Sequence, residues 1–336
     1  MIPPIAVISY RPHRLLPVLW LLALAGCARP FHTPVSTAGH PIVTSGQFRL
    51  ADGTALPWRD WLPERAPRAV VLALHGFNDS RDAWAMAAPT LTRAGIAVFA
   101  PDLPGFGATP GRGFWPGTAR MVGAARQMAA ILHRRYPGIP LTVMGESMGG
   151  AAALLLGAQG DTAVASYVLV SPAVWGGRAM AAPLRFAAAL SGAVVPGMRL
   201  TGQRMKVLAS DNRHALTLLF EDPLTIHATR LGTVAGLVRM MGRAQDACSR
   251  FAPKHALILY GGHDQLIPKP AMAECWRALP PDPGVRLAFY PPDYHLMLLD
   301  HERATPTGDI AAFILHPDAP LPSAAGTDAM IFMARH

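Results

Sequence analysis

The sequence predicts an α/β fold in which a mostly parallel β-sheet is covered by helices on both faces. Short, continuously apolar runs alternate with helix-length segments, hydrophobic residues make up 51% of the 336-residue chain, and one strand-like run leads through a glycine-flanked serine into a helix-like run. Continuous apolar runs are typical of strands buried on both faces, as in a parallel sheet. A chain of this length and composition can bury a full hydrophobic core.

The first 26 residues are predicted to be a secretory signal. Basic residues between positions 11 and 14 precede an apolar run that is short for a transmembrane helix. The run ends in Leu-Ala-Gly-Cys at 24–27, which resembles a bacterial lipobox, and the resemblance implies that Cys27 becomes the lipid-modified first residue of the mature chain. Because Ala28 and not Asp follows, it also implies delivery to the outer membrane of a Gram-negative cell. The alternative is an ordinary cleaved signal in which Cys27 is incidental.

The rest of the chain divides into a tether, one folded domain and a tail. Residues 27–45 are rich in Pro, Thr, Ser and Gly, so we expect a flexible tether between the lipid anchor and a domain at 46–316. The domain begins with a predicted β-hairpin whose tight turn is Asp52-Gly53. Residues 317–336 are expected to form a loose C-terminal tail.

The expected strands after the hairpin are at 69–74, 96–100, 141–144, 167–170, 256–260 and 285–290. The expected helices are at 83–93, 118–135, 148–156, 271–279 and 296–303. The alternation stops between 172 and 256, in a segment that is too long for an ordinary connection. We therefore expect a mostly helical cap at about 173–231, followed by the next crossover helix.

Ser147 is the predicted nucleophile. It is the central residue of Gly145-Glu146-Ser147-Met148-Gly149, between an apolar strand and a helix. This arrangement is typical of a nucleophile elbow, in which a tight turn presents the hydroxyl at the carboxyl edge of a sheet. The flanking glycines leave room for the strained backbone. The alternative is a serine with a purely structural role.

His295 is the predicted general base, because a serine hydroxyl is a poor nucleophile at neutral pH without one. In elbow sites of this kind the acid and then the histidine follow the serine along the chain. Of thirteen histidines, His295, His301, His316 and His336 lie late enough. His295 follows the last predicted strand, whereas His301 falls within the next helix and the other two lie near the end. The alternative is that His295 only caps its helix.

Asp264 is the predicted acid that orients His295. It lies in the loop directly after the predicted strand at 256–260, so it should reach the edge of the sheet where the nucleophile lies. Two alternatives stay open. Asp264 can merely cap the following helix, or Asp293, which is closer to His295 in sequence, can be the acid.

Two backbone N–H groups are expected to form an oxyanion hole, since ester cleavage places negative charge on the carbonyl oxygen. Met148, directly after the nucleophile, supplies one. Phe77, in the loop after the predicted strand at 69–74, supplies the other. His75 precedes the nucleophile in the chain, so we expect it to brace this loop by hydrogen bonds instead of taking part in catalysis.

Five motifs carry a family resemblance: His75-Gly76-Phe77, 102–107, 145–150, 262–268 and Tyr294-His295. On these motifs the chain resembles the monoacylglycerol lipase and lysophospholipase branch of the α/β-hydrolases, also grouped with the serine aminopeptidases, from about 48 to 315. The resemblance implies a mostly parallel eight-stranded sheet, an inserted helical cap and a structural role for Asp102 under the site. The family usually has a second glycine soon after His-Gly, where this chain has Phe77-Asn78-Asp79-Ser80.

Cys248 and Cys275 remain once Cys27 is assigned to the lipid anchor. They flank the predicted strand at 256–260, and successive crossover helices often lie side by side. In an oxidising compartment the two cysteines can therefore form a disulfide. The alternative is two unpaired, partly buried thiols.

The predicted activity is hydrolysis of carboxylic esters through an acyl-Ser147 intermediate. Lipid esters such as monoacylglycerol or lysophospholipid are the expected substrates, because a lipid-anchored enzyme would share a membrane with them. Apolar cap residues are expected either to line an acyl slot or to form the core of the cap itself: Met180, Met198, Met205, Leu208, Leu216, Leu218, Leu219, Met240 and Met241.

Alternative activities use the same three residues: acyl transfer, thioester cleavage or peptide cleavage. A catalytically silent surface binding protein is the alternative from another class. No cofactor or metal is expected, because the sequence contains neither a Gly-rich phosphate loop nor metal-ligand spacing. The formal charge of +9 is spread over scattered Arg residues, which does not predict nucleic-acid binding, and the sequence does not predict an oligomeric state.

Overall fold

The computed structural model describes residues 42–44, 46–201, 207–281 and 284–336. The predicted signal, Cys27 and most of the predicted tether lie outside these residues. None of the helices in these ranges is long and apolar enough to span a membrane.

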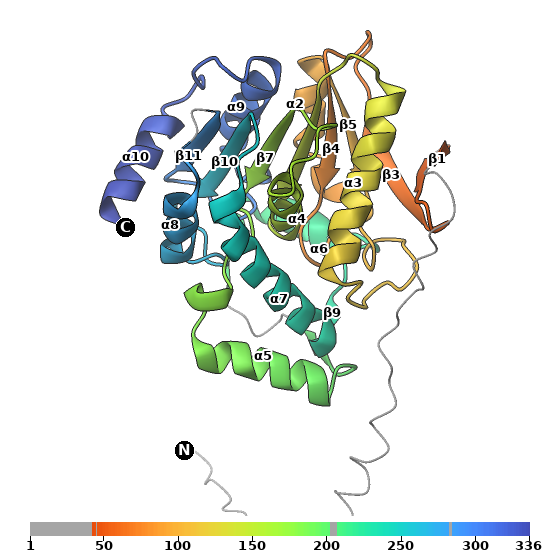
Figure 1. The fold of residues 1–336 in the computed structure, drawn as a ribbon, viewed down its shortest axis with the longest axis vertical. Coiled ribbons are helices and arrows are strands. Elements are labelled where there is room, and N and C mark those ends of the chain that lie inside the picture. The colour runs from red at the N-terminus through yellow and green to blue at the C-terminus, as the bar shows by residue number, and fades with distance from the viewer. Residues whose placement is uncertain (1–41, 45, 202–206, 282–283) are drawn as a thin grey trace, which may run out of the picture. The chain divides into compact units, whose positions relative to one another are not determined.

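A nine-stranded sheet forms the centre of the fold (Figure 1), in the order β1-β2-β3-β5-β4-β6-β7-β10-β11. Six strands pair in parallel from β5 to β11, while β1, β2 and β3 pair antiparallel at one edge. The strands are β1 (Ile42–Thr44), β2 (Gln47–Arg49), β3 (Ala55–Trp61), β4 (Ala69–Leu74), β5 (Ile96–Pro101), β6 (Leu141–Glu146), β7 (Ser166–Val170), β10 (Ala256–Gly261) and β11 (Val285–Tyr290). The predicted mostly parallel sheet is confirmed: eight strands are the predicted ones, and β1 is a ninth, formed within the segment expected to be a tether.

Helices cover both faces of the sheet. Every residue of β4, β5, β6, β7 and β10 is buried, as expected for strands covered on two sides. The face that carries Phe99 and Tyr167 packs against α3, α4, α7 and α8, and the face that carries Val71 and Val98 packs against α2 and α9. These helices are α2 (Ala88–Arg93), α3 (Thr118–Arg135), α4 (Met148–Gly157), α7 (Leu231–Ala247), α8 (Lys269–Ala278) and α9 (Ala304–Leu315).

The described residues of the cap segment between β7 and α7 form two helices and a small second sheet. Its elements are the 3-10 turn η3 (Gly177–Ala179), α5 (Ala182–Val194), β8 (Arg199–Thr201), α6 (Arg213–Glu221) and β9 (Ala228–Arg230). In Figure 1, α5 lies across α7 on the side where β9 joins that helix. The antiparallel pair of β8 and β9 was not predicted, because strands of three residues are too short to show a hydrophobic period.

The helix predicted at 296–303 is wrong. These residues form turns, and α9 begins only at Ala304. The apolar side chains of Met297 and Leu298 are buried, but the local backbone is held by polar partners: the carboxylate of Asp300 accepts from the N–H of Tyr294 at 2.7 Å. A buried apolar run therefore forms a tethered turn here instead of a helix.

The expectation of a loose tail at 317–336 is also wrong. Helix α10 (Ala325–Arg335) packs on β11, and the ring of Phe332 stacks on that of Phe289 with centroids 4.7 Å apart. The buried carboxylate of Asp309 holds the connection, since it accepts from the hydroxyl of Tyr290 at 2.8 Å and from the N–H of Ser323 at 3.1 Å. The end of the chain is thus part of the hydrophobic core.

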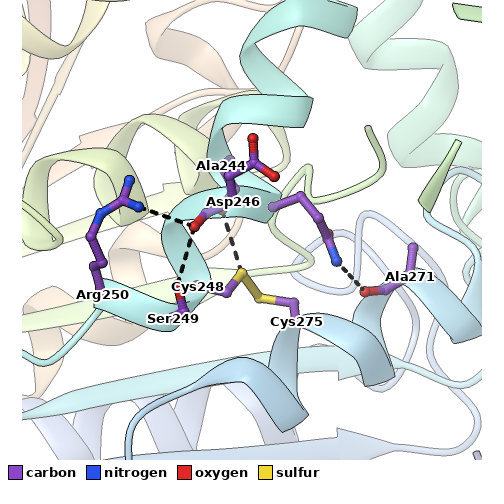
Figure 2. The surroundings of a disulfide bond; sticks show 8 residues. Ala244, Asp246, Cys248, Ser249, Arg250, Ala271 and Cys275 are labelled. Carbon is purple, nitrogen blue, oxygen red and sulfur yellow. Dashed lines mark hydrogen bonds between the residues drawn. A yellow bond between two sulfur atoms is a disulfide. The ribbon is translucent and has the colours of Figure 1, made fainter. Parts of the chain in front are cut away.

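A disulfide joins Cys248 and Cys275, which lie 27 residues apart in the chain (Figure 2). Cys248 begins the 3-10 turn η5 (Cys248–Arg250) at the end of α7, and Cys275 lies in α8. The side-chain amide of Gln245 adds a hydrogen bond of 3.4 Å to the carbonyl of Ala271. The disulfide therefore links the helix that follows the cap to the helix that follows the loop of Asp264.

Candidate active site

Ser147 lies at a sharp turn between β6 and α4. Its φ of 53° and ψ of −114° are unfavourable for a residue with a Cβ atom. The flanking glycines permit the turn, because a Cβ on Gly149 would lie 2.0 Å from the carbonyl oxygen of Leu74, and one on Gly145 would lie 2.2 Å from the carbonyl oxygen of Gly149. The backbone has the form of a nucleophile elbow.

His295 and Asp264 form a buried pair at the same edge of the sheet. The Nδ1 atom of His295 lies 2.8 Å from Oδ2 of Asp264. The other carboxylate oxygen, Oδ1, accepts from the N–H groups of Leu266 at 2.7 Å and Ile267 at 2.9 Å. Asp264 is therefore fixed by its own loop and holds the imidazole with the Nδ1–H tautomer, so that Nε2 remains for a second partner.

Ser147 and His295 meet at one cavity of about 610 Å³. Its lining is largely apolar, and the two reactive side chains lie together with Gly76 and Phe77 of the loop after β4. A cavity of this size and chemistry holds a small molecule that carries a substantial apolar part.

The alternative acid, Asp293, and the three alternative histidines do not line the cavity that Ser147 and His295 share. Asp293 makes no hydrogen bond to His295, and one of its carboxylate oxygens, Oδ2, is buried without a partner among the described residues. Burial, together with the charges of Asp300, Asp211 and Glu302, raises the pKa of Asp293 to about 7. His301, His316 and His336 are exposed, and none of them lines the cavity.

The two residues predicted to supply oxyanion donors lie close to Ser147: one follows it in the chain, and the other lines the same cavity. Met148 is the first residue of α4, and Phe77 follows β4. The N–H groups of Phe77 and Met148 donate to no acceptor among the described residues. A Cβ on Gly76 would lie 3.7 Å from the Cβ of Ser147, so this loop packs directly against the elbow.

His75 and Asp102 brace the same loop from below. The Nε2 atom of His75 accepts from the N–H of Leu103 at 3.0 Å, and its Nδ1–H donates to the carbonyl of Gly76 at 2.7 Å. Burial lowers the pKa of His75, which favours this neutral tautomer. The carboxylate of Asp102 accepts from the backbone N–H groups of Arg81 and Ala108, each at 2.8 Å. Both residues hold the backbone and do not face the cavity.

The cap supplies part of the apolar lining, together with α7. Of the cap residues expected to line an acyl slot or the cap core, Met180, Leu219 and Met241 line the cavity. Met240 belongs to the core, while Met198, Leu208 and Leu218 are exposed and Leu216 is half-buried. Met205 lies outside the described residues.

Two buried carboxyl groups beside the site were not predicted. Asp79 lines the cavity, and burial raises its pKa to about 7, helped by the charges of Asp222, Asp82 and Asp102. Glu146, which precedes the nucleophile, has a pKa well above its usual range, because of burial first and then the charges of Asp79 and Asp300. Asp79 lies three residues after Gly76 of the His-Gly motif, so its place in that loop was the available signal. Within the described ranges no three His, Cys, Asp or Glu side chains are grouped as metal ligands would be.

Comparison with known proteins agrees with this geometry. The parallel sheet, the elbow, the cap and the paired histidine and aspartate define an α/β-hydrolase. The family model described as serine aminopeptidase, S33 matches residues 65–302, and the chain belongs to this family.

Its similarity extends to the monoacylglycerol-lipase-like branch. The chain is 30% identical over 219 residues to the monoglyceride lipase of Mus musculus, which covers 64% of this chain and 72% of that protein. It is 25% identical over 271 residues to the monoacylglycerol lipase of Mycolicibacterium smegmatis, with 80% and 95% covered. The fold is similar to a soluble variant of monoglyceride lipase from Saccharomyces cerevisiae, solved in complex with a substrate analog. For that structure the TM-score is 0.68 at 19% identity, with 88% of this chain and 99% of that chain covered.

Proposed function

We propose that this carboxylic ester hydrolase cleaves monoacylglycerols, or similar lipid esters with a single acyl chain, through an acyl intermediate on Ser147. The observation that carries the proposal is the cavity in which Ser147 and His295 lie together among apolar side chains. Such a lining favours an acyl chain, and the similarity to monoglyceride lipases supports glycerol as the alcohol.

The proposed reaction begins with attack of the Ser147 hydroxyl on the ester carbonyl carbon, while Nε2 of His295 takes the hydroxyl proton. Asp264 stabilises the resulting imidazolium through its hydrogen bond to Nδ1. The N–H groups of Phe77 and Met148 stabilise the negative oxygen of the tetrahedral intermediate. The C–O bond to the alcohol then breaks, and His295 returns the proton to the departing alkoxide. Water, deprotonated by His295, then attacks the carbonyl carbon of the acyl-enzyme. The bond between that carbon and the Ser147 oxygen breaks, and His295 returns the proton to the Ser147 oxygen, which releases the fatty acid and the free hydroxyl.

The protein is further proposed to work at a lipid surface, anchored through Cys27 to the outer membrane. The cap supports this location, because α5 exposes Leu184, Phe186 and Leu190, and the chain from 162 to 210 carries five Arg or Lys residues and no Asp or Glu. An apolar helix face on a segment whose own charged residues are all basic fits an anionic lipid surface. In a Cys27→Ser background, Phe186→Asp with Leu190→Asp should weaken sedimentation with phosphatidylglycerol vesicles and leave hydrolysis of a soluble ester unchanged. If the Cys27→Ser protein sedimented equally well with and without the two cap substitutions, the proposed role of the cap in membrane binding would be contradicted.

The substrate proposal is tested by product analysis on purified protein. Monoacylglycerol, lysophosphatidylcholine, an acyl thioester and an aminoacyl amide are compared, with Ser147→Ala as the control. Release of fatty acid and glycerol at the highest kcat/KM supports the proposal. Faster cleavage of the amide would replace the ester as the substrate, whereas faster cleavage of lysophosphatidylcholine would select that lipid over monoacylglycerol among esters with a single acyl chain. Transfer of the acyl group to added glycerol in preference to water would replace hydrolysis.

A further inference from the structure

We infer that Asn78 is a positioning residue that couples the cap to the oxyanion hole, an inference that rests on the proposed function. Asn78 lies in Phe77-Asn78-Asp79-Ser80, the stretch in which the resembled family usually has a second glycine, and it follows Phe77, whose N–H is a proposed oxyanion donor. Its φ of 66° is in the left-handed region. Among residues with a Cβ atom, Asn adopts this region more readily than most, so the backbone tolerates it. The side chain that glycine would lack is then available for a new contact.

That contact reaches the cap. The side-chain Nδ2 of Asn78 donates to Oγ1 of Thr229 at 2.5 Å, and Thr229 lies in β9, 151 residues further along the chain. The carbonyl of Asn78 accepts from the N–H of Ile226 at 2.8 Å. The backbone of Asn78 is therefore bound to the segment between α6 and β9, and its side chain is bound to β9 itself.

Ser80 adds a second tie between the same loop and the cap. Its hydroxyl donates to Oδ2 of Asp222 at 2.8 Å, while the other carboxylate oxygen of Asp222 accepts from the N–H of Leu224. The cap segment from Asp222 to Thr229 thus holds one side of the loop after β4 through Asn78 and Ser80. At the start of that loop, His75 is held by its hydrogen bond with the N–H of Leu103.

In the chain, Phe77 lies between His75 and Asn78, the two residues that these contacts hold. The direction of its N–H is set by the torsions of Gly76 and Phe77, which in turn depend on where the cap holds Asn78. Transition-state stabilisation is sensitive to such placement, because donors act on an oxygen that reaches its final position only in the tetrahedral state. Loss of the Asn78–Thr229 contact should therefore reduce kcat more than it changes KM.

The experiment is a double-mutant cycle on hydrolysis of 4-nitrophenyl butyrate by the full chain. Asn78→Gly removes the side chain and keeps the φ angle accessible, and Thr229→Val removes the acceptor while keeping the shape. Each single variant should lower kcat about tenfold with KM within about twofold, and the double variant should be no worse than either single one. Thr229→Ser, which keeps the hydroxyl, should restore kcat to within about twofold of the wild type. Thr217→Val is the matched control, since that exposed hydroxyl bonds only within α6.

Three results would overturn the inference. They are unchanged kcat in both single variants, multiplied effects in the double variant, and a loss that appears in KM or in melting temperature and not in kcat. If the wild type is active and both single variants keep its kcat, the inference falls but the proposed function stands. A wild-type chain without esterase activity would overturn the proposed function and the inference with it.

Discussion

The Nδ1 atom of His295 and the Oδ2 atom of Asp264 lie 2.8 Å apart in a buried pair, although 31 residues separate them in the chain. The contact exists because β10 and β11 are parallel neighbours, so the loops that follow them leave the same edge of the sheet. The pair gives a direct test of which carboxylate orients the base.

Asp264→Asn should lower kcat by about 10³–10⁴-fold on a soluble ester, because an amide at this position favours the wrong tautomer of His295. Asp293→Asn is the matched variant, since Asp293 is also buried and lies two residues before His295. It should keep kcat within about fivefold of the wild type, because it makes no hydrogen bond to the imidazole. The reverse order of the two losses would transfer the role to Asp293.

The stability of the protein should fall as pH rises through the titration of Asp79. Its pKa is raised from 3.8 to about 7 in the folded state, by burial first, so between these values the folded state holds a proton that the unfolded state has lost. This contribution is fully present below the lower value and is lost as pH approaches the higher one. The substitution Asp79→Asn removes this pH dependence. Between about pH 5 and about pH 8 the free energy of unfolding of the wild type should therefore fall by up to about 3 kcal/mol relative to that of the variant.

Urea unfolding at the two pH values measures this difference, with Asp60→Asn as the control. Asp60 is exposed in β3, so its substitution should leave the pH dependence unchanged. If wild type and Asp79→Asn showed parallel pH dependence, Asp79 would not be protonated in the folded state.

Acyl-chain preference should depend on the α7 wall of the cavity. Val238 lines the cavity and its neighbour Arg239 is exposed, so Val238→Trp fills the acyl space while Arg239→Trp adds the same ring outside it. Val238→Trp should lower kcat/KM about tenfold for long-chain monoacylglycerols and change it by less than about twofold for short-chain ones. Measured chain-length profiles that coincide for the two variants would place the acyl chain elsewhere.

The disulfide between Cys248 and Cys275 should contribute to stability through the 27-residue separation that it spans. Chain-entropy arguments give about 3–4 kcal/mol for a loop of this length. The double substitution to Ala should lower the free energy of urea unfolding by about this amount, and it should make unfolding insensitive to dithiothreitol. If dithiothreitol did not shift the urea midpoint of wild-type unfolding, the assignment of a disulfide would be contradicted.

Sequence patterns predicted those parts of the fold whose signal is local. The strands at 69–74 and 285–290 and the helix at 118–135 have the observed bounds, because each is marked by its own apolar periodicity and by turn residues at its ends. The run at 296–303 shows the limit of such patterns, since its apolar side chains are buried in a turn that distant polar groups hold. Helix α10 was missed because its partner Phe289 lies far back in the chain.

In the candidate site, too, the sequence predicted the residues that have a local motif and missed the contacts that only folding creates. Ser147, Asp264 and His295 could be proposed because each has a motif around it and a required place in the chain order. The contact of Asn78 with Thr229 could not, since 151 residues separate two ordinary polar side chains. The raised pKa of Asp79 could not be predicted either, because it depends on burial and on the charges of residues brought together by folding.

Trapping of the acyl-enzyme tests the central claim most directly. The protein is mixed with excess 4-nitrophenyl ester, quenched in acid within the burst phase and digested for peptide mass mapping. We predict one acyl group per chain on the peptide that contains Ser147, and neither acylation nor ester hydrolysis in Ser147→Ala. An acyl group on any other residue, or hydrolysis that persists in Ser147→Ala, would contradict the account.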